Sequence, residues 1–353
     1  MNALSLDTVV LSADRTALEI LDQTLLPGEI RVLRLSRQED IREAIYSLRV
    51  RGAPAIGVCA GYAMALAGSQ IVAESYSDFL AAFREKKNYL ATARPTAVNL
   101  FWALERMERV VTSHPELPVA ELRERLFAEA DAIRTEDIAI SRAIGKIGLG
   151  LLRHGDGILT HCNAGTLATA KYGTATAPIY AALDEGWDDL RVYCDETRPL
   201  LQGARLTAFE MQSAGVNTTL LCDNAASSLM QSGKVNIIFV GCDRVARNGD
   251  TANKIGTSAV AILARHYGIP FYVCAPSSTI DISIPDGAAI PIEQRPGEEV
   301  TEMWYAHRMA PEGVDVYNPA FDVTPHSLIT GIITERGLCT APFEKAFREC
   351  GIL

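Results

Sequence analysis

The chain has 353 residues, of which 48% are hydrophobic and 22% are charged. This balance predicts a folded protein with about two domains and argues against a disordered chain. The net charge of −10, with no local basic run, argues against nucleic acid as a partner. No apolar run reaches the length of about 18 residues that a membrane span requires, and the N-terminus lacks the pattern of a signal peptide, so we expect no membrane partner and a cytoplasmic location. The eight cysteines include no C-x-x-C pair, which predicts reduced thiols and no metal site.

The first part of the chain is predicted to form a small antiparallel sheet. Two strand-like runs, 18–25 and 30–35, flank a Pro-Gly turn signal. Ser36 is then typical of a helix N-cap, and Glu39 completes the sequence pattern of a capping box.

Helical periodicity dominates the next hundred residues. The predicted helices cover residues 58–68, 77–92, 96–112 and 118–153. The last helix is expected to break near Gly145 or Gly148, and its first part is interpreted as the domain junction. We therefore expect an N-terminal domain of residues 1–130, with a small sheet plus helices, and a C-terminal domain of residues 131–353.

Two arginines lie at helix connections in the first domain. Arg51 precedes Gly52 and Ala53 at the start of a helix, where exposed N–H groups favour an anion; a tight corner between helices is the alternative. Arg94 lies in a loop before Pro95, where an arginine is usually only solvated.

After residue 157, short β-rich runs alternate with helical stretches. This alternation predicts βαβ units around a parallel sheet, and therefore an α/β fold. The expected strands are residues 157–161, 191–194, 217–221, 236–240 and 270–274. Neither a G-x-G-x-x-G nor a P-loop motif follows the first of them, so a nicotinamide dinucleotide is not expected.

The stretch 158–170 carries the most specific chemical signal. A buried strand runs directly into a small-residue turn at Cys162, and then into a helix start. N–H groups and the helix dipole at such a turn favour an anion and the thiolate form of a cysteine. The stretch therefore suggests a reactive thiol beside an anionic substrate, although a cysteine at a strand end is more often a small packing residue.

Other strand ends carry polar groups. Asp243 follows an apolar strand, where burial would raise its pKa and make it a general acid; capping of the following turn is the alternative. Asn253 and Lys254 end a turn-rich loop from which they can reach an anion, and a solvated loop is equally consistent with the sequence. Gln202 opens a predicted helix after the strand at 191–194.

Together these motifs resemble the methylthioribose-1-phosphate isomerase family, within the superfamily that includes ribose-1,5-bisphosphate isomerase and the regulatory subunits of translation initiation factor 2B. The resemblance covers essentially the whole chain. It depends on seven motifs, at residues 51–57, 94–96, 161–165, 196–199, 202–205, 241–244 and 253–254.

The resemblance implies a Rossmann-like C-terminal domain beside the smaller N-terminal one, a homodimer, and no cofactor. It assigns the chemistry to Cys162 and Asp243. It also implies that a second group of residues binds the sugar phosphate. This group is Arg51, Gly52, Ala53, Arg94, Gln202, Asn253 and Lys254.

The implied activity is aldose–ketose isomerisation of 5-methylthioribose 1-phosphate to 5-methylthioribulose 1-phosphate in methionine salvage. Two alternatives remain open at this point. One is an isomerase of another pentose phosphate, ribose 1,5-bisphosphate or 5-deoxyribose 1-phosphate. The other is a non-catalytic regulatory protein on the same scaffold, which has no need of both Cys162 and Asp243.

Overall fold

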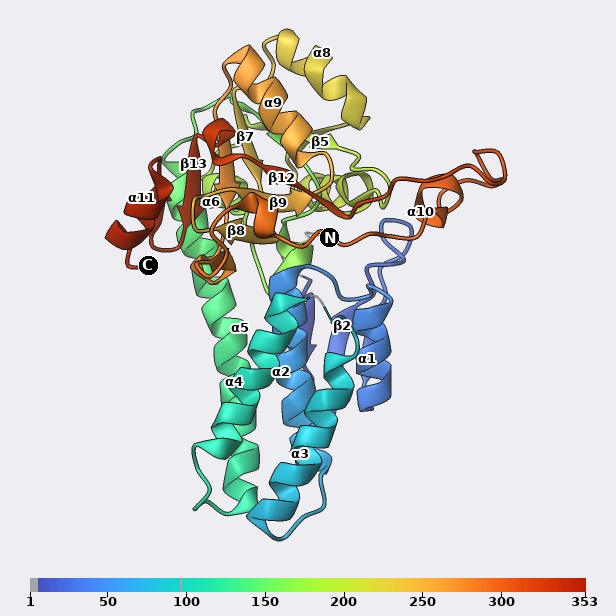
Figure 1. The fold of residues 1–353 in the computed structure, drawn as a ribbon, viewed down its shortest axis with the longest axis vertical. Helices are drawn as coiled ribbons and strands as arrows, with labels where there is room; N and C mark the ends of the chain where they lie inside the picture. The colour runs from blue at the N-terminus through green and yellow to red at the C-terminus, as the bar shows by residue number, and fades with distance from the viewer. Residues whose placement is uncertain (1–5, 96) are drawn as a thin grey trace. The chain divides into compact units, whose positions relative to one another are not determined.

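The computed structural model describes residues 6–95 and 97–353, and its described residues divide into two compact units (Figure 1). The first unit contains residues up to 139 together with the short segment 166–173. The second contains residues 140–165 and 174–353. Helix α5 (Val119–Leu149) begins in the first unit and ends in the second.

The first unit begins with a three-stranded antiparallel sheet in the order β1-β2-β3. Its strands are β1 (Val9–Leu11), β2 (Leu18–Leu21) and β3 (Val32–Leu35). The predicted antiparallel unit is therefore confirmed. Its strands are shorter than predicted, and β1 was not expected as a separate strand.

Helix α1 (Gln38–Tyr46) begins later than the sequence predicted. The capping box at Ser36 and Glu39 is wrong, because the residue at the N-cap is Arg37, which makes no side-chain capping bond. The backbone carbonyl of Ser36 instead accepts a hydrogen bond of 2.9 Å from Gln70 Nε2. The helix still buries Ile41, as its spacing predicted.

Three further helices pack against one another, with the first of them also on the sheet, and their prediction is confirmed. They are α2 (Ala53–Gln70), α3 (Tyr76–Ala91) and α4 (Val98–Thr112). Helix α2 is buried along nearly its whole length because small and apolar side chains face every direction, so it forms the core of the first unit.

Helix α5 is continuous, and the expected break at Gly145 or Gly148 is wrong. Both glycines instead permit close packing of α6 (Ala177–Asp184) against α5. A Cβ atom at Gly145 would lie 2.7 Å from the Ala177 carbonyl oxygen, and one at Gly148 would lie 2.4 Å from Pro178 Cγ. Among the described residues, no helix is both long enough and apolar enough to span a membrane.

The second unit is built on a seven-stranded sheet in the order β14-β13-β10-β7-β4-β5-β6. All neighbouring strands are parallel except the β13–β14 pair at one edge. The strands are β4 (Gly157–Thr160), β5 (Arg191–Asp195), β6 (Asn217–Leu221), β7 (Ile237–Val240), β10 (Phe271–Cys274), β13 (Gly331–Thr334) and β14 (Gly337–Cys339). The predicted parallel α/β sheet is confirmed.

Helices α8 (Ala226–Gln231), α9 (Thr257–Tyr267) and α11 (Phe343–Glu349) share one hydrophobic cluster with the central strands of this sheet. The other α-helices described in this unit are α7 (Ala208–Ser213) and α10 (Glu298–Thr301). A smaller four-stranded sheet has the order β11-β8-β9-β12. Its strands are β8 (Arg244–Ala246), β9 (Thr251–Lys254), β11 (Ile280–Asp281) and β12 (Phe321–Thr324).

Candidate functional site

The candidate site of the second unit lies where the strand order of the large sheet reverses. The chain passes from β4 to β5 and β6 on one side, then returns to β7 on the other side of β4. Strands β4 and β7 are parallel neighbours, with Leu159 opposite Ile238. In open parallel sheets, ligands bind at the carboxyl ends of the strands beside such a reversal. Cys162 follows the end of β4, and Asp243 follows the end of β7, so both predicted residues lie in loops at the carboxyl ends of the two strands beside the reversal.

The two loops that carry these residues lie against each other. Gly241 follows β7, and a Cβ atom at this position would lie 2.4 Å from Ala164 Cβ in the loop after β4. Only a glycine therefore allows the loop of Asp243 to approach the loop of Cys162 this closely.

Cys162 has a backbone conformation that is rare for a residue with a side chain. Its φ is +67°, in the left-handed region. Its backbone N–H donates to Thr197 Oγ1 at 2.8 Å, and its carbonyl accepts from Thr207 Oγ1 at 2.6 Å. The residue is 8% exposed. Strained backbone of this kind persists where surrounding contacts hold it, and it occurs at active sites. This geometry distinguishes Cys162 from an ordinary packing cysteine.

Cys194 and Cys274, at the ends of β5 and β10, fit the packing interpretation instead. Both are fully buried within the sheet, and burial raises the pKa of each thiol. Because the thiolate is the reactive form, these two thiols are chemically inert at neutral pH.

Asp243 lies at the predicted place, but its side chain is exposed, so the expectation of burial is wrong for this structure. The reason is local. Strand β7 ends at Val240, and the Asp243 N–H donates to the Ala252 carbonyl at 2.9 Å, which starts the β8–β9 hairpin beyond the large sheet. The carboxyl group is therefore accessible at the edge of the sheet.

Asn253 and Lys254 end the same hairpin, so they lie beside Asp243. Asn253 is buried, and its Nδ2 donates to Thr257 Oγ1 at 3.0 Å, at the start of α9. Lys254 is half-buried, and its Nζ lies 4.4 Å from the centre of the Phe321 ring. These residues are part of an ordered strand, which contradicts the alternative of a solvated loop.

Gln202 immediately precedes a short π-helix, η3 (Gly203–Thr207), in the loop after β5. Its side chain is buried, and its Oε1 has no hydrogen-bond partner among the described residues. A buried amide oxygen of this kind is available to a ligand. Thr197 joins this loop to Cys162, as described above, so Gln202 belongs to the same part of the second unit.

The other predicted phosphate-binding residues lie in the first unit. Gly52 is the N-cap of α2, with φ +89°, and Arg51 and Ala53 flank it. A Cβ atom at Gly52 would lie 2.5 Å from Ala168 Cα, so a tight backbone approach requires glycine here. Arg94 is half-buried in the loop between α3 and α4, where its carbonyl accepts from the Ala97 N–H at 3.1 Å.

The sequence interpretation missed a buried polar cluster beside Cys162. It consists of His161 and Asp195, which are buried, and Asp223 after β6, which is half-buried; their polar side-chain atoms lie within 4.8 Å of one another. Asp223 accepts hydrogen bonds of 2.7 Å from the N–H groups of Thr197 and Arg198. Its carboxylate thus holds the loop that supports Cys162. The only signal for this cluster in the sequence is that each member follows or ends a strand.

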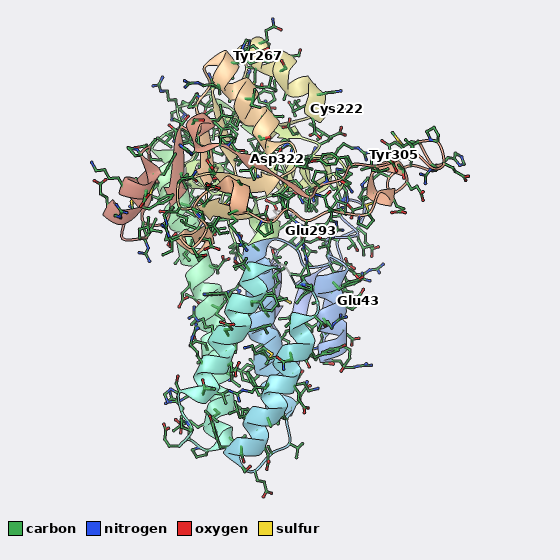
Figure 2. All side chains as sticks on the ribbon, in the orientation of Figure 1. Glu43, Cys222, Tyr267, Glu293, Tyr305 and Asp322 are labelled. Carbon is green, nitrogen blue, oxygen red and sulfur yellow. The ribbon has the colours of Figure 1, made fainter. Side chains whose placement is uncertain are left out.

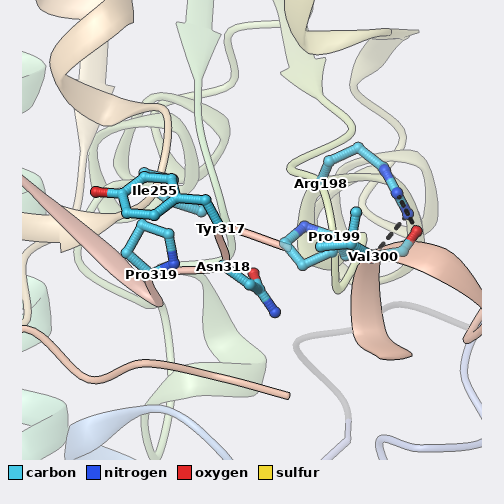
Figure 3. A pocket seen from close by; sticks show the side chains of 7 residues that line it. All are labelled: Arg198, Pro199, Ile255, Val300, Tyr317, Asn318 and Pro319. Carbon is cyan, nitrogen blue, oxygen red and sulfur yellow. Dashed lines mark hydrogen bonds between the residues drawn. The ribbon is translucent and has the colours of Figure 1, made fainter. Parts of the chain in front are cut away.

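A cavity of 190 Å³ opens next to this cluster (Figure 3). Its lining residues are Arg198, Pro199, Ile255, Val300, Tyr317, Asn318 and Pro319. Arg198 is the one charged residue among the seven, and its Nη2 donates to the Val300 carbonyl at 2.9 Å. The guanidinium also stacks 5.5 Å from the centre of the Tyr305 ring (labelled in Figure 2). The walls are therefore mainly apolar.

Comparisons with known proteins identify the family and the relatives of the chain. Residues 49–341 match the model of the initiation factor 2 subunit family. The chain is 61% identical to methylthioribose-1-phosphate isomerase of Symbiobacterium thermophilum, over 98% of this chain and 96% of that protein. It is 53% identical to 5-deoxyribose 1-phosphate isomerase of Bacillus anthracis, over 94% and 95% of the two chains.

Two solved structures are similar to the chain over nearly its whole length. The 5-methylthioribose 1-phosphate isomerase of Pyrococcus horikoshii superposes with a TM-score of 0.93 at 44% identity, over 99% of this chain and 97% of that one. The translation initiation factor eIF-2B subunit delta of A. fulgidus superposes with a TM-score of 0.89 at 38% identity, over 98% and 99%.

Proposed function

Because the chain belongs to the initiation factor 2 subunit family, we propose that it is an aldose–ketose isomerase that converts 5-methylthioribose 1-phosphate to 5-methylthioribulose 1-phosphate in methionine salvage. One observation carries the proposal furthest. A strained cysteine and an accessible carboxyl group follow the two strands at which the sheet order reverses, in a chain 61% identical to an isomerase of this name.

The chemistry of this substrate requires an acid and a group that handles a hydrogen. The phosphate on the anomeric oxygen blocks the free aldehyde, so the furanose ring opens by protonation of its ring oxygen. Asp243 donates this proton. A hydrogen then moves from C2 to C1. As thiolate, Cys162 removes the C2 proton and returns it to C1 through an enediolate-like intermediate, while the proton of the C2 hydroxyl returns to Asp243 as C2 becomes a carbonyl. Both side chains therefore regain their starting protonation after turnover. We infer that the bound substrate covers the exposed Asp243 carboxyl group and shields it from water.

A direct hydride shift from C2 to C1 is the alternative route, in which Cys162 assists without accepting a proton. Turnover in deuterated water separates the two routes. Proton transfer through the sulfur introduces solvent deuterium at C1, whereas a hydride shift retains the original hydrogen.

We propose two groups of sugar-phosphate contacts and describe each within its own unit. In the first unit these are Arg51, Gly52, Ala53 and Arg94, where the start of α2 offers N–H groups and a favourable dipole to an anion. In the second unit they are Gln202, Asn253 and Lys254. The buried and unpartnered Oε1 of Gln202 accepts a sugar hydroxyl, and Lys254 supplies a positive charge.

Alanine in place of Arg94 is expected to raise KM by about tenfold or more with little change in kcat. A charged hydrogen bond to phosphate contributes about 1.5–3 kcal/mol and is made equally in the ground state and the transition state. Steady-state kinetics of the purified variant measure both constants. A fall in kcat at unchanged KM would remove Arg94 from the phosphate contacts.

The cavity beside Ile255 supports a substrate with an apolar group on C5. Its walls suit a methylthio group, whereas a second phosphate needs cations, and the Arg198 guanidinium already donates to Val300. This observation favours methylthioribose 1-phosphate over ribose 1,5-bisphosphate. It does not discriminate against 5-deoxyribose 1-phosphate, which the relatives at 53% identity make the second candidate substrate.

Incubation of the purified protein with each of the three sugar phosphates, followed by detection of the ketose product, tests the proposal. We expect the highest kcat/KM with 5-methylthioribose 1-phosphate. Preferred turnover of the 5-deoxy sugar would reassign the substrate, and no turnover of any sugar would favour a regulatory protein.

We also propose a cytoplasmic homodimer. Large apolar side chains are exposed on the segment that follows α10, among them Met303, Trp304, Tyr305 and Met309. A second copy of the chain would shield such side chains from water. Sedimentation equilibrium is expected to give twice the mass of the 38.2 kDa chain.

A further inference from the structure

The His161 imidazole is enclosed between two oxygen acceptors. Its side chain is 1% exposed, Nδ1 lies 3.0 Å from Asp195 Oδ2, and Nε2 lies 2.8 Å from the Ile255 carbonyl oxygen. Gly256 makes room for the ring, because a Cβ atom there would lie 2.8 Å from its Cε1. The ring thus connects the ends of β4 and β5 with the residue that follows Lys254.

This geometry fixes the number of protons that His161 and Asp195 hold together. A carbonyl oxygen only accepts, so Nε2 must donate to Ile255. The contact between Nδ1 and Asp195 then needs a second proton, whether the ring or the carboxyl group carries it. In both forms, His161 and Asp195 together hold one proton more than a neutral imidazole and a carboxylate.

The surrounding charges favour this extra proton. Asp195 and Asp223 contribute negative charge around the ring, and Glu196 and Asp223 do so around Asp195. Burial alone would lower the pKa of His161, but the hydrogen bond and the charge of Asp195 outweigh burial and raise it. Burial also raises the pKa of Asp195, and the His161 contact opposes this only in part.

The Ile255 side of the contact is held in place as well. Asp322 in β12 (labelled in Figure 2) accepts from the Gly256 N–H at 2.8 Å and from the Ser258 N–H at 3.1 Å. Lys254, the nearest cation on this segment, is directed to the Phe321 ring. The bond from His161 to Ile255 therefore restrains the positions of Asn253 and Lys254, which precede Ile255 in the chain.

We propose that His161 and Asp195 form a positioning pair, whose shared buried proton ties the loop of Cys162 to the segment that carries Asn253 and Lys254. The inference rests on the proposed function, because the residues that it positions are those of the isomerase site.

The His161→Leu variant is expected to lower kcat by about 100-fold and to raise KM, because misplacement of reacting groups by about 1 Å costs that much. The Asp195→Asn variant is expected to retain most of the wild-type kcat. Its amide Nδ2 can donate to Nδ1 while Nε2 still donates to Ile255. Asp195 Oδ1 has no hydrogen-bond partner among the described residues, so an amide oxygen there loses no contact.

The wild type and the Asp195→Asn variant should differ in the pH dependence of their stability. A raised His161 pKa stabilises the wild type fully below the unfolded pKa of about 6.5, and this stabilisation is lost as the pH rises through the folded pKa. In Asp195→Asn the buried imidazole is neutral, so that variant loses stability as the pH falls below about 6.5. The Tm of the wild type relative to the variant should therefore decrease steadily from pH 5 to pH 9.

The surface pair of His154 and Asp189, 3.1 Å apart, provides the matched control. His154→Leu should leave kcat and KM unchanged. Circular dichroism checks folding, and if His161→Leu does not fold, Asp195→Asn carries the test alone.

Wild-type kinetics in His161→Leu, an Asp195→Asn variant as impaired as His161→Leu, or a Tm difference that is independent of pH would each overturn the proposal. If the wild type isomerises none of the three sugar phosphates, the proposed function fails, while the Tm comparison still tests the shared proton.

Discussion

Serine in place of Cys162 lowers kcat by at least about 100-fold, the scale of a lost acid–base group. A hydroxyl fits the same space, but its pKa is too high for it to take a proton from C2. The residue keeps the hydrogen bonds of its backbone to Thr197 and Thr207, so the loop should retain its conformation. Steady-state kinetics with 5-methylthioribose 1-phosphate, together with circular dichroism, measure the effect.

Cys222→Ser is the control for this variant. Cys222 also follows a strand of the large sheet, but its side chain is exposed and it has no role in the proposed chemistry. Its kcat should equal that of the wild type. A Cys162→Ser enzyme within a few-fold of the wild type would exclude the sulfur from the hydrogen transfer.

Asparagine in place of Asp243 is the second variant with a large expected effect, again at least about 100-fold in kcat. The amide has the shape of the carboxyl group but cannot donate an acidic proton to the ring oxygen. The side chain is exposed and the backbone N–H keeps its bond to Ala252, so stability should not change.

Asp188→Asn, at an exposed aspartate far along the chain from both loops, is the matched control and should leave kcat unchanged. If Asp243→Asn retained activity on the cyclic substrate, another group would have to open the ring. If Asp243→Asn lost turnover of the cyclic substrate but still bound the product as the wild type does, the assigned role would be supported.

The large sheet could be predicted from the sequence because its strands are short apolar runs that end at turns. The same pattern located Cys162 and Asp243, since residues after neighbouring parallel strands share one edge of a sheet. The order of the strands could not be predicted. It depends on long-range pairing such as that of Leu159 with Ile238, which no local pattern encodes.

Local signals failed where tertiary contacts outweighed them. Ser36 matched a capping pattern, but its carbonyl bonds to Gln70 and the helix begins after it. Gly145 and Gly148 suggested a break, but they serve packing against α6. The burial of Asp243 was inferred from the apolar strand before it, whereas the hairpin after it decides its exposure. The His161–Asp195 contact joins residues 34 positions apart and has no local signature.

Three residues with side chains, Cys162, Thr197 and Leu201, have left-handed backbone in the loops after β4 and β5, with φ between +56° and +67°. Each such conformation costs on the order of 1–3 kcal/mol, and the remainder of the sheet must supply that stability. A change that removes this strain is therefore expected to raise Tm and to lower kcat. The Leu201→Gly variant would relieve the backbone strain and raise Tm. The loop would then hold Cys162 less firmly, so the heat-resistant variant should have a lower kcat.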